Sequence, residues 1–206
     1  MKRSFVIVFI LSLSPALWGQ MAKYAADTHA LVNAGKLENN SYVNEHAGFV
    51  VHLPVARCNP DLNQQVDFFE GSAVLLSCAR EVRGGGAYDL SIFTESWTRD
   101  HLTSIKQYVD RLQAIGEHRR KGSDSSVTTI EPETPRDWAG LSFDELILGL
   151  HNAGSTYYVG ATCTHLKDYV LCFKAQANSL PLVRGLLRLQ GKLEVTNPPE
   201  LAKTKH

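Results

Sequence analysis

The sequence predicts an α+β domain, with a single antiparallel β-sheet of about six or seven strands flanked by helices. Three observations support this fold class. Short apolar stretches that alternate with polar residues recur between Gly, Pro and Asn turns, from residues 49–53 to residues 169–177. Residues 102–115 have the three- and four-residue apolar spacing of an amphipathic helix. The third observation is a β-hairpin near the end of the chain, at residues 156–177.

This hairpin consists of two β-rich runs that flank Lys167-Asp168. With those two residues as the loop, Cys163 lies opposite Cys172 in a non-hydrogen-bonded pair, where opposing side chains come closest. The register therefore favours a cross-strand disulfide in an oxidising compartment. The opposite face of the hairpin is expected to meet a helix, and it carries Tyr158, Thr162, Leu171, Phe173, Ala175 and Ala177.

Residues 1–19 have the features of a secretory signal peptide. Lys2 and Arg3 precede an apolar run at residues 5–17, and Gly19 follows at the expected cleavage position. The run is short for a membrane span, so we expect a secreted or periplasmic protein with no stable membrane insertion after cleavage. The alternative is an uncleaved N-terminal anchor.

Four cysteines in an exported chain favour two disulfides. Pairing Cys163 with Cys172 leaves Cys58 to pair with Cys78. The alternative is four buried free thiols. No Cys-x-x-Cys motif occurs and the eight histidines are scattered, so we expect neither a metal nor a cofactor.

The charge balance argues against a nucleic-acid partner. The whole chain has 21 basic and 21 acidic residues, and loss of Lys2 and Arg3 with the leader leaves 19 basic residues. The densest basic cluster is residues 119–121. It is much smaller than the basic stripe that phosphate binding requires.

The first half of the chain divides into an N-terminal arm or short helix at residues 20–40 and the start of a single domain at residues 41–195. Residues 72–80 form a nearly continuous apolar run and predict a central strand. The glycines at 84–86 then turn a hairpin into a strand that contains residues 88–92.

In the second half, Asp100 is expected to cap the amphipathic helix and Gly116 to end it. Strands are predicted at residues 127–130 and 138–150. The apolar content of the second segment also fits a helix, but Leu141 and Phe143 alternate and Gly140 and Gly149 disfavour a helix. A last helix begins after its cap, Ser179, and buries Leu180, Val183, Leu186 and Leu187. We expect the tail, residues 196–206, to be disordered.

Several of these segments resemble PsbP-like (Mog-type) domains of bacterial exported proteins. The motifs are Tyr42-x-Asn44, Gly48-Phe49 with its alternating strand and Pro54, then Ser142-Phe143, Tyr169-Val170-Leu171-x-Phe173 and the closing helix. The family's usual aromatic residue after the proline is replaced by Val55. The resemblance implies an antiparallel sheet flanked by helices and a binding or accessory role without catalytic residues.

No motif in the chain indicates an enzyme. Ser142 lies in Gly-Leu-Ser-Phe-Asp, which lacks the second glycine of a nucleophile elbow. A thiol enzyme would use Cys163 with His165, but a disulfide-bonded sulfur cannot attack. Asp144 and Glu145 are adjacent on a strand and so face opposite sides. The aromatic residues that could line a pocket, or fill the core, are Tyr42, Trp97, Trp138 and Tyr157.

The sequence thus predicts an exported, non-enzymatic binding or accessory module stabilised by disulfides, whose partner is an envelope protein or a small ligand. One alternative is a secreted hydrolase or thiol-dependent enzyme whose residues meet only in three dimensions. Another is a purely structural or stress-related secreted protein.

Overall fold

The computed structural model describes residues 30–53, 73–82, 86–97, 102–118, 125–130, 136–138, 140–152, 154–188 and 193–195. The elements within these ranges are β1 (Gly35–Glu38), β2 (Ser41–Asn44), β3 (Phe49–His52), β4 (Ala73–Val82), β5 (Gly86–Ser96), α2 (Ile105–His118), β6 (Ser125–Ile130), β7 (Arg136–Trp138), β8 (Leu141–Asn152), β9 (Ser155–Leu166), β10 (Tyr169–Ala177), α3 (Leu180–Leu187) and β11 (Leu193–Val195). The predicted leader and the predicted C-terminal tail lie outside the described residues.

The strands form two antiparallel sheets. The larger has the order β4-β5-β10-β9-β8-β6, with β7 also paired to β8, and the smaller has the order β1-β2-β3-β11. The α+β class is therefore confirmed, but the prediction of a single sheet is wrong. The reason is that β3 pairs with β2 on one edge and with β11 on the other, so neither edge remains for the larger sheet.

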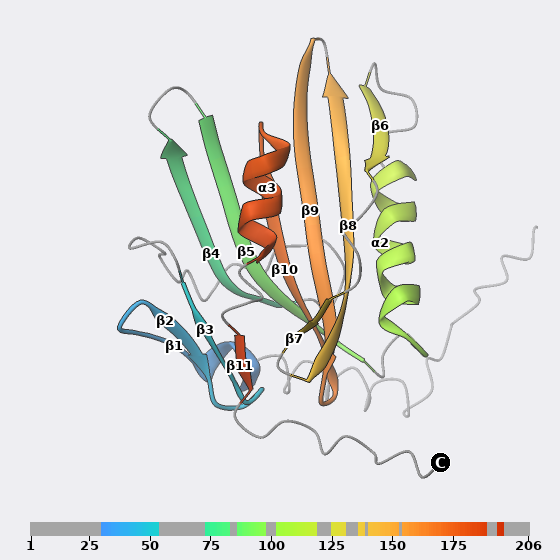
Figure 1. Ribbon diagram of the computed structural model, residues 1–206. Helices are drawn as coiled ribbons and strands as arrows, with labels where there is room; N and C mark the ends of the chain where they lie inside the picture. Colours follow the sequence, from blue (N-terminus) through green and yellow to red (C-terminus); the bar gives the residue numbers. More distant parts are fainter. Residues whose placement is uncertain are drawn as a thin grey trace, which may run out of the picture.

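Helices α2 and α3 cover opposite faces of the larger sheet. Figure 1 shows α3 across β10 and α2 next to β8. Helix α3 packs on the face predicted to meet a helix, and its buried side chains are Val183, Leu186 and Leu187. Against them lie Leu171, Phe173, Ala175 and Ala177 of β10. The smaller sheet contributes Tyr42, Phe49, Val51 and Leu193 to this same core. Helix α2 packs on the other face, over the two cysteines of the hairpin.

The predicted hairpin is confirmed as β9 and β10. Leu166 lies opposite Tyr169 and Cys163 lies opposite Cys172, which is the predicted register. The loop residue Lys167 has a φ of 54°, a backbone conformation that tight turns demand and that most side chains avoid.

Helix α2 begins later than predicted. Asp100, the expected cap, lies outside the described residues, and the helix starts at Ile105. The backbone N–H of Gln107 donates to Ser104 Oγ at 3.1 Å, and Gln107 Oε1 accepts from the Thr103 N–H at 3.0 Å. This reciprocal pattern satisfies donors that the first helical turn leaves without intrahelical partners.

Gly116 does not end α2, which continues to His118. A Cβ atom at position 116 would lie 2.7 Å from Leu148 Cδ1 of β8. The glycine therefore permits close packing of the helix on the sheet, and this requirement explains its place in the sequence better than a cap does.

The structure also differs from two predictions about strands. Strand β4 was expected to be central, but it occupies one end of the order of the larger sheet. Its apolar sequence is explained by burial, because Leu75 and Leu76 are both fully buried. The predicted hairpin into β5 is confirmed, with Val82 opposite Gly86. At the N-terminus, residues 30–33 of the expected arm or short helix are helical, and residues 35–38 form strand β1, which pairs with β2.

Candidate functional site

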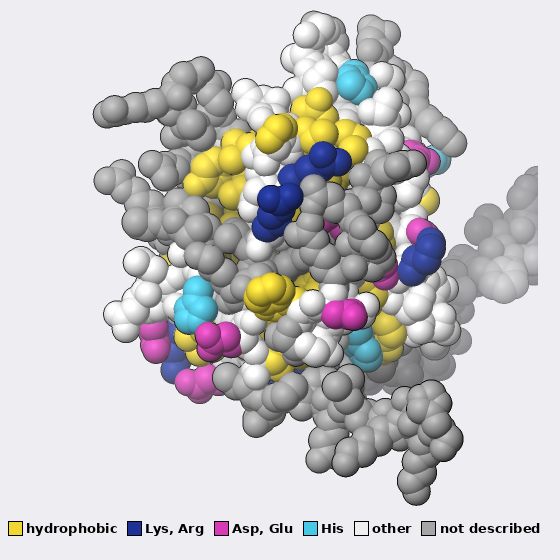
Figure 2. Space-filling model, in the orientation of Figure 1, with side chains coloured by type: hydrophobic (Ala, Val, Ile, Leu, Met, Phe, Trp, Pro, Cys, Tyr) yellow, Lys and Arg dark blue, Asp and Glu magenta, His cyan; other side chains and the backbone are white. Residues whose placement is uncertain are grey.

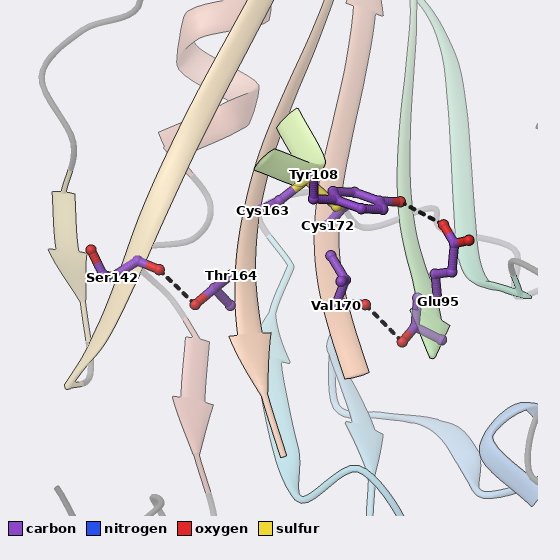
Figure 3. Close-up of a disulfide and its surroundings, with 8 residues drawn as sticks. Glu95, Tyr108, Ser142, Cys163, Thr164, Val170 and Cys172 are labelled. Atoms are coloured by element: carbon purple, nitrogen blue, oxygen red, sulfur yellow. Dashed lines mark hydrogen bonds between the residues drawn. A yellow bond between two sulfur atoms is a disulfide. The ribbon is translucent and has the colours of Figure 1, made fainter. Parts of the chain in front are cut away.

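The face of the larger sheet beneath α2 contains the predicted disulfide. Cys163 and Cys172 are joined with an S–S distance of 2.06 Å and a Cα–Cα distance of 4.1 Å. Figure 3 shows the Tyr108 ring of α2 beside them, and its hydroxyl donates to Glu95 Oε2 at 3.0 Å. Both cysteines are fully buried. A partner thiolate must reach a sulfur to exchange with it, so this position suits a structural disulfide and not an exchanging one.

Cys78 is also disulfide-bonded, and none of the cysteines in the described ranges is free. Its predicted partner Cys58 lies outside these ranges, so the Cys58–Cys78 pairing stays a prediction.

Buried threonines on the opposite face of the sheet, beside Leu171, are satisfied by backbone carbonyls. Thr164 Oγ1 donates to the Ser142 carbonyl at 2.7 Å, and Thr94 Oγ1 donates to the Val170 carbonyl at 2.9 Å (Figure 3). A buried hydroxyl without a partner would cost free energy, so these bonds explain how polar residues fit inside the sheet.

The face of the larger sheet beneath α2 changes from apolar to polar side chains at the same position along three neighbouring strands, β4, β5 and β10. Val170, Cys172 and Phe93 pack in the apolar cluster under α2. Farther along β10 and β5 on this face the side chains are polar. Among the described elements, α2 packs chiefly over β8 and β9. We name these half-buried residues the polar sheet face: Ser77, Asp89, Ser91, Lys174 and Gln176.

Asp89 is the centre of this face. Its Oδ2 accepts from Gln176 Nε2 at 3.0 Å, and its Oδ1 accepts from Ser77 Oγ at 3.4 Å. These bonds link β4, β5 and β10 and fix the direction of the carboxylate. A carboxylate held in this way is a preorganised acceptor.

Burial also changes the acid–base properties of two neighbours of Asp89. Partial burial lowers the pKa of Lys174, and the negative charge of Asp89 opposes that effect. Burial raises the pKa of Tyr157, which is 36% exposed at the rim of the face, and the Asp89 charge raises it further. Both groups therefore lie in surroundings poorer in water than an ordinary surface, a property more common at binding sites than elsewhere.

The aromatic residues predicted to line a pocket do not converge. Tyr42 is buried in the core under the smaller sheet, with its ring 5.9 Å from that of Phe49. Trp97 stacks on His165, with ring centroids 3.8 Å apart. Tyr157 lies near the other end of β9 from His165, about 26 Å away at about 3.3 Å per residue.

Trp138, the fourth of these aromatic residues, is 42% exposed and donates from Nε1 to the Leu193 carbonyl at 3.3 Å. It therefore joins β7 to β11. These aromatic side chains therefore fill the core or its rim, the alternative that the sequence left open, and do not line a shared pocket.

The residues that the sequence offered as catalytic candidates lie in regular parts of the sheet. Ser142 lies inside β8 opposite Asp137, away from any strained turn. Burial lowers the pKa of His165, while the Lys167 backbone and the Asp168 charge raise it. Asp144 and Glu145 lie opposite Cys163 and Thr162 respectively, so they face different sides of the sheet as predicted.

Sequence reasoning missed the polar sheet face. The alternation of Lys174 and Gln176 with Ala175 and Ala177 was visible, but it is also typical of any solvent-facing strand side. Only the position of α2 distinguishes the part of the face that this helix covers from the part that it does not cover.

Two further properties concern the described ranges alone. No cluster of three or more His, Cys, Asp or Glu side chains there could hold a metal ion. The helices within those ranges are all too short or too polar to cross a bilayer.

Comparisons with known proteins show a similarity of fold. No family model and no curated protein matches this sequence. Among solved structures, the chain is similar to the solution structure of cyanobacterial PsbP (CyanoP) from Synechocystis sp. PCC 6803, with a TM-score of 0.48 and 14% sequence identity. The match covers 78% of this chain and 96% of that chain.

Proposed function

We propose that this protein acts outside the cytoplasm as a binding or accessory module, and that it holds its partner on the polar sheet face. The observation that carries the proposal is the Asp89 carboxylate, fixed by two hydrogen bonds beside a partly desolvated Lys174. Partner groups that bind there displace little water and need little reordering of the protein.

The chemistry of the face describes the partner. Asp89 accepts hydrogen bonds, and the Lys174 ammonium favours an anionic or carbonyl oxygen. The partner should therefore present donors and an anionic or carbonyl group a few ångströms apart. A polar segment of an envelope protein and a small zwitterionic ligand both meet this description.

An extracytoplasmic location is supported by the disulfides. Disulfides persist in oxidising compartments and are rare in the cytosol. They also remove Cys163 and Cys172 as nucleophiles, which weakens the thiol-enzyme alternative.

A photo-crosslinking experiment tests the proposal. The mature protein would carry a photoreactive amino acid in place of Ser91, opposite Lys174 on the face, and would be exposed to an envelope extract and to a small-ligand panel. We expect a discrete adduct that Asp89→Asn and Lys174→Met each reduce at least tenfold. Lys106→Met is the matched control, because Lys106 pairs with Asp110 on the exposed side of α2, and it should leave the adduct unchanged.

Two results would overturn the proposal. One is an adduct whose yield is the same in all variants, because the polar sheet face would then play no part in capture. The other is the absence of any adduct with both the envelope extract and the small-ligand panel.

A further inference from the structure

A second group of interacting polar side chains lies on the smaller sheet, away from the polar sheet face. Ser41 Oγ lies 2.8 Å from His52 Nδ1, and His52 Nε2 lies 2.8 Å from Glu194 Oε1. The three residues belong to adjacent strands β2, β3 and β11. Figure 2 shows a histidine among acidic side chains over this sheet, on the surface that faces the viewer.

The register of the smaller sheet explains how these residues meet. Ser41 and His52 are directly opposite each other on β2 and β3. Glu194 lies opposite Val50, one step diagonally from His52 on the same outer face. The inner face carries Tyr42, Phe49 and Val51, which are buried. Alternation thus forces Ser41, His52 and Glu194 outward, and the His52 side chain is 47% exposed.

The hydrogen bonds determine the tautomer of His52. A carboxylate accepts hydrogen bonds only, so Glu194 requires the hydrogen on Nε2. The Nδ1 lone pair is then directed to the Ser41 hydroxyl, which must donate to it. A hydroxyl that donates to an imidazole oriented by a carboxylate has the arrangement of an activated serine nucleophile.

From this geometry we propose that Ser41 is a base-activated nucleophile toward activated acyl esters, with His52 as general base and Glu194 as the positioning residue. Ser41 Oγ attacks the ester carbonyl carbon while its proton moves to His52 Nδ1. The carbon–oxygen bond to the leaving group then breaks, and the alcohol departs with the proton from His52. Water, activated by the same nitrogen, attacks the acyl-serine, which restores Ser41 and releases the acid.

The exposure of the site restricts the class of substrate. The oxyanion formed in the attack would be solvated by water at this open surface, and preorganised donors usually contribute a large part of the rate in hydrolases. The reaction should therefore require a good leaving group, as in aryl esters and fluorophosphonates. This activity goes beyond binding on the polar sheet face and shares no residue with it.

Labelling of the purified mature protein with a fluorophosphonate, followed by peptide mass spectrometry, tests the proposal. We expect the label on Ser41. His52→Gln should slow labelling by about 100-fold, at the lower end of what general-base catalysis contributes. Glu194→Gln should slow it by at least about tenfold, whereas Glu194→Asp, which keeps a carboxylate, should restore part of the rate.

The chain contains an internal control. His151 lies between two threonine hydroxyls, 3.0 Å from Thr128 Oγ1 and 3.0 Å from Thr156 Oγ1. Both ring nitrogens of His151 are thus taken by hydroxyls, and no carboxylate of the described residues bonds the ring, so neither threonine should be labelled. Absence of label on Ser41, or equal rates for wild type and His52→Gln, would overturn the proposal and leave these hydrogen bonds a purely structural role. Capture on the polar sheet face would be unaffected by either outcome, so the two proposals fail independently.

Discussion

Removal of the hairpin disulfide should destabilise the protein by an amount that the chain-entropy model gives directly. Cys163 and Cys172 are nine positions apart in the sequence. In that model, a cross-link closing a loop of about ten residues stabilises the folded state by about 2.7 kcal/mol at 25 °C. For a chain of this length, the melting temperature should fall by about 5–10 °C.

The choice of replacement separates the cross-link from packing. Both cysteines are fully buried beneath α2, so replacing both with Ala also leaves a cavity where the sulfurs were. Replacing both with Val fills most of that space and suits a β-strand. Cys163→Ala/Cys172→Ala should therefore be less stable than Cys163→Val/Cys172→Val, and the valine variant should show the loss of the cross-link more directly.

Urea unfolding of the mature protein under non-reducing conditions, followed by tryptophan fluorescence, measures these differences. The second predicted disulfide remains intact in every variant, so it cancels in the comparison. A valine variant within about 0.5 kcal/mol of wild type would contradict the reasoning. It would show that the turn at Lys167-Asp168 already restricts the unfolded hairpin and leaves the cross-link little entropy to remove.

Three further outcomes follow from packing and burial. Gly160→Val should cost about 1–3 kcal/mol in urea unfolding, because even a Cβ there would lie 2.6 Å and 2.9 Å from methyl carbons of α3, whereas Gly185→Ala, in open space on that helix, should be neutral or slightly stabilising. Asn44→Ala should cost about 2–4 kcal/mol in the same assay, since the buried amide accepts from one backbone N–H and donates to one carbonyl. Burial raises the pKa of Tyr42 to about 12, so the unfolded chain loses this proton first. The stability that the protonated Tyr42 hydroxyl contributes is complete below about pH 10. It should fall by up to about 3 kcal/mol as the pH rises toward 12, a loss that Tyr42→Phe should lack.

The parts of the fold that the sequence predicted are those fixed by local rules. A two-residue loop fixes the register of the strands on either side of it, so the position of Lys167-Asp168 was enough to place Cys163 opposite Cys172. Alternation along β10 likewise predicted which face would meet α3. The division into two sheets could not be predicted in this way. It depends on which distant strand occupies the second edge of β3, and several apolar strands of similar composition could have done so.

The same distinction between local rules and tertiary packing applies to the Ser41–His52–Glu194 group. Ser41 and His52 are joined by the β2–β3 hairpin, so their pairing could have been derived once residues 41–44 were recognised as a strand that pairs with residues 49–52. Glu194 is 142 residues from His52 in the sequence. It arrives on β11, a three-residue strand after the last helix, and nothing in its local sequence indicates a partner. A strand this short gains little from its own hydrogen bonds, so its position depends on the packing of Leu193 in the core and on contacts such as Trp138 with the Leu193 carbonyl. The carboxylate that orients His52 is therefore placed by tertiary packing of the chain end, which is why a search for local catalytic motifs did not find it.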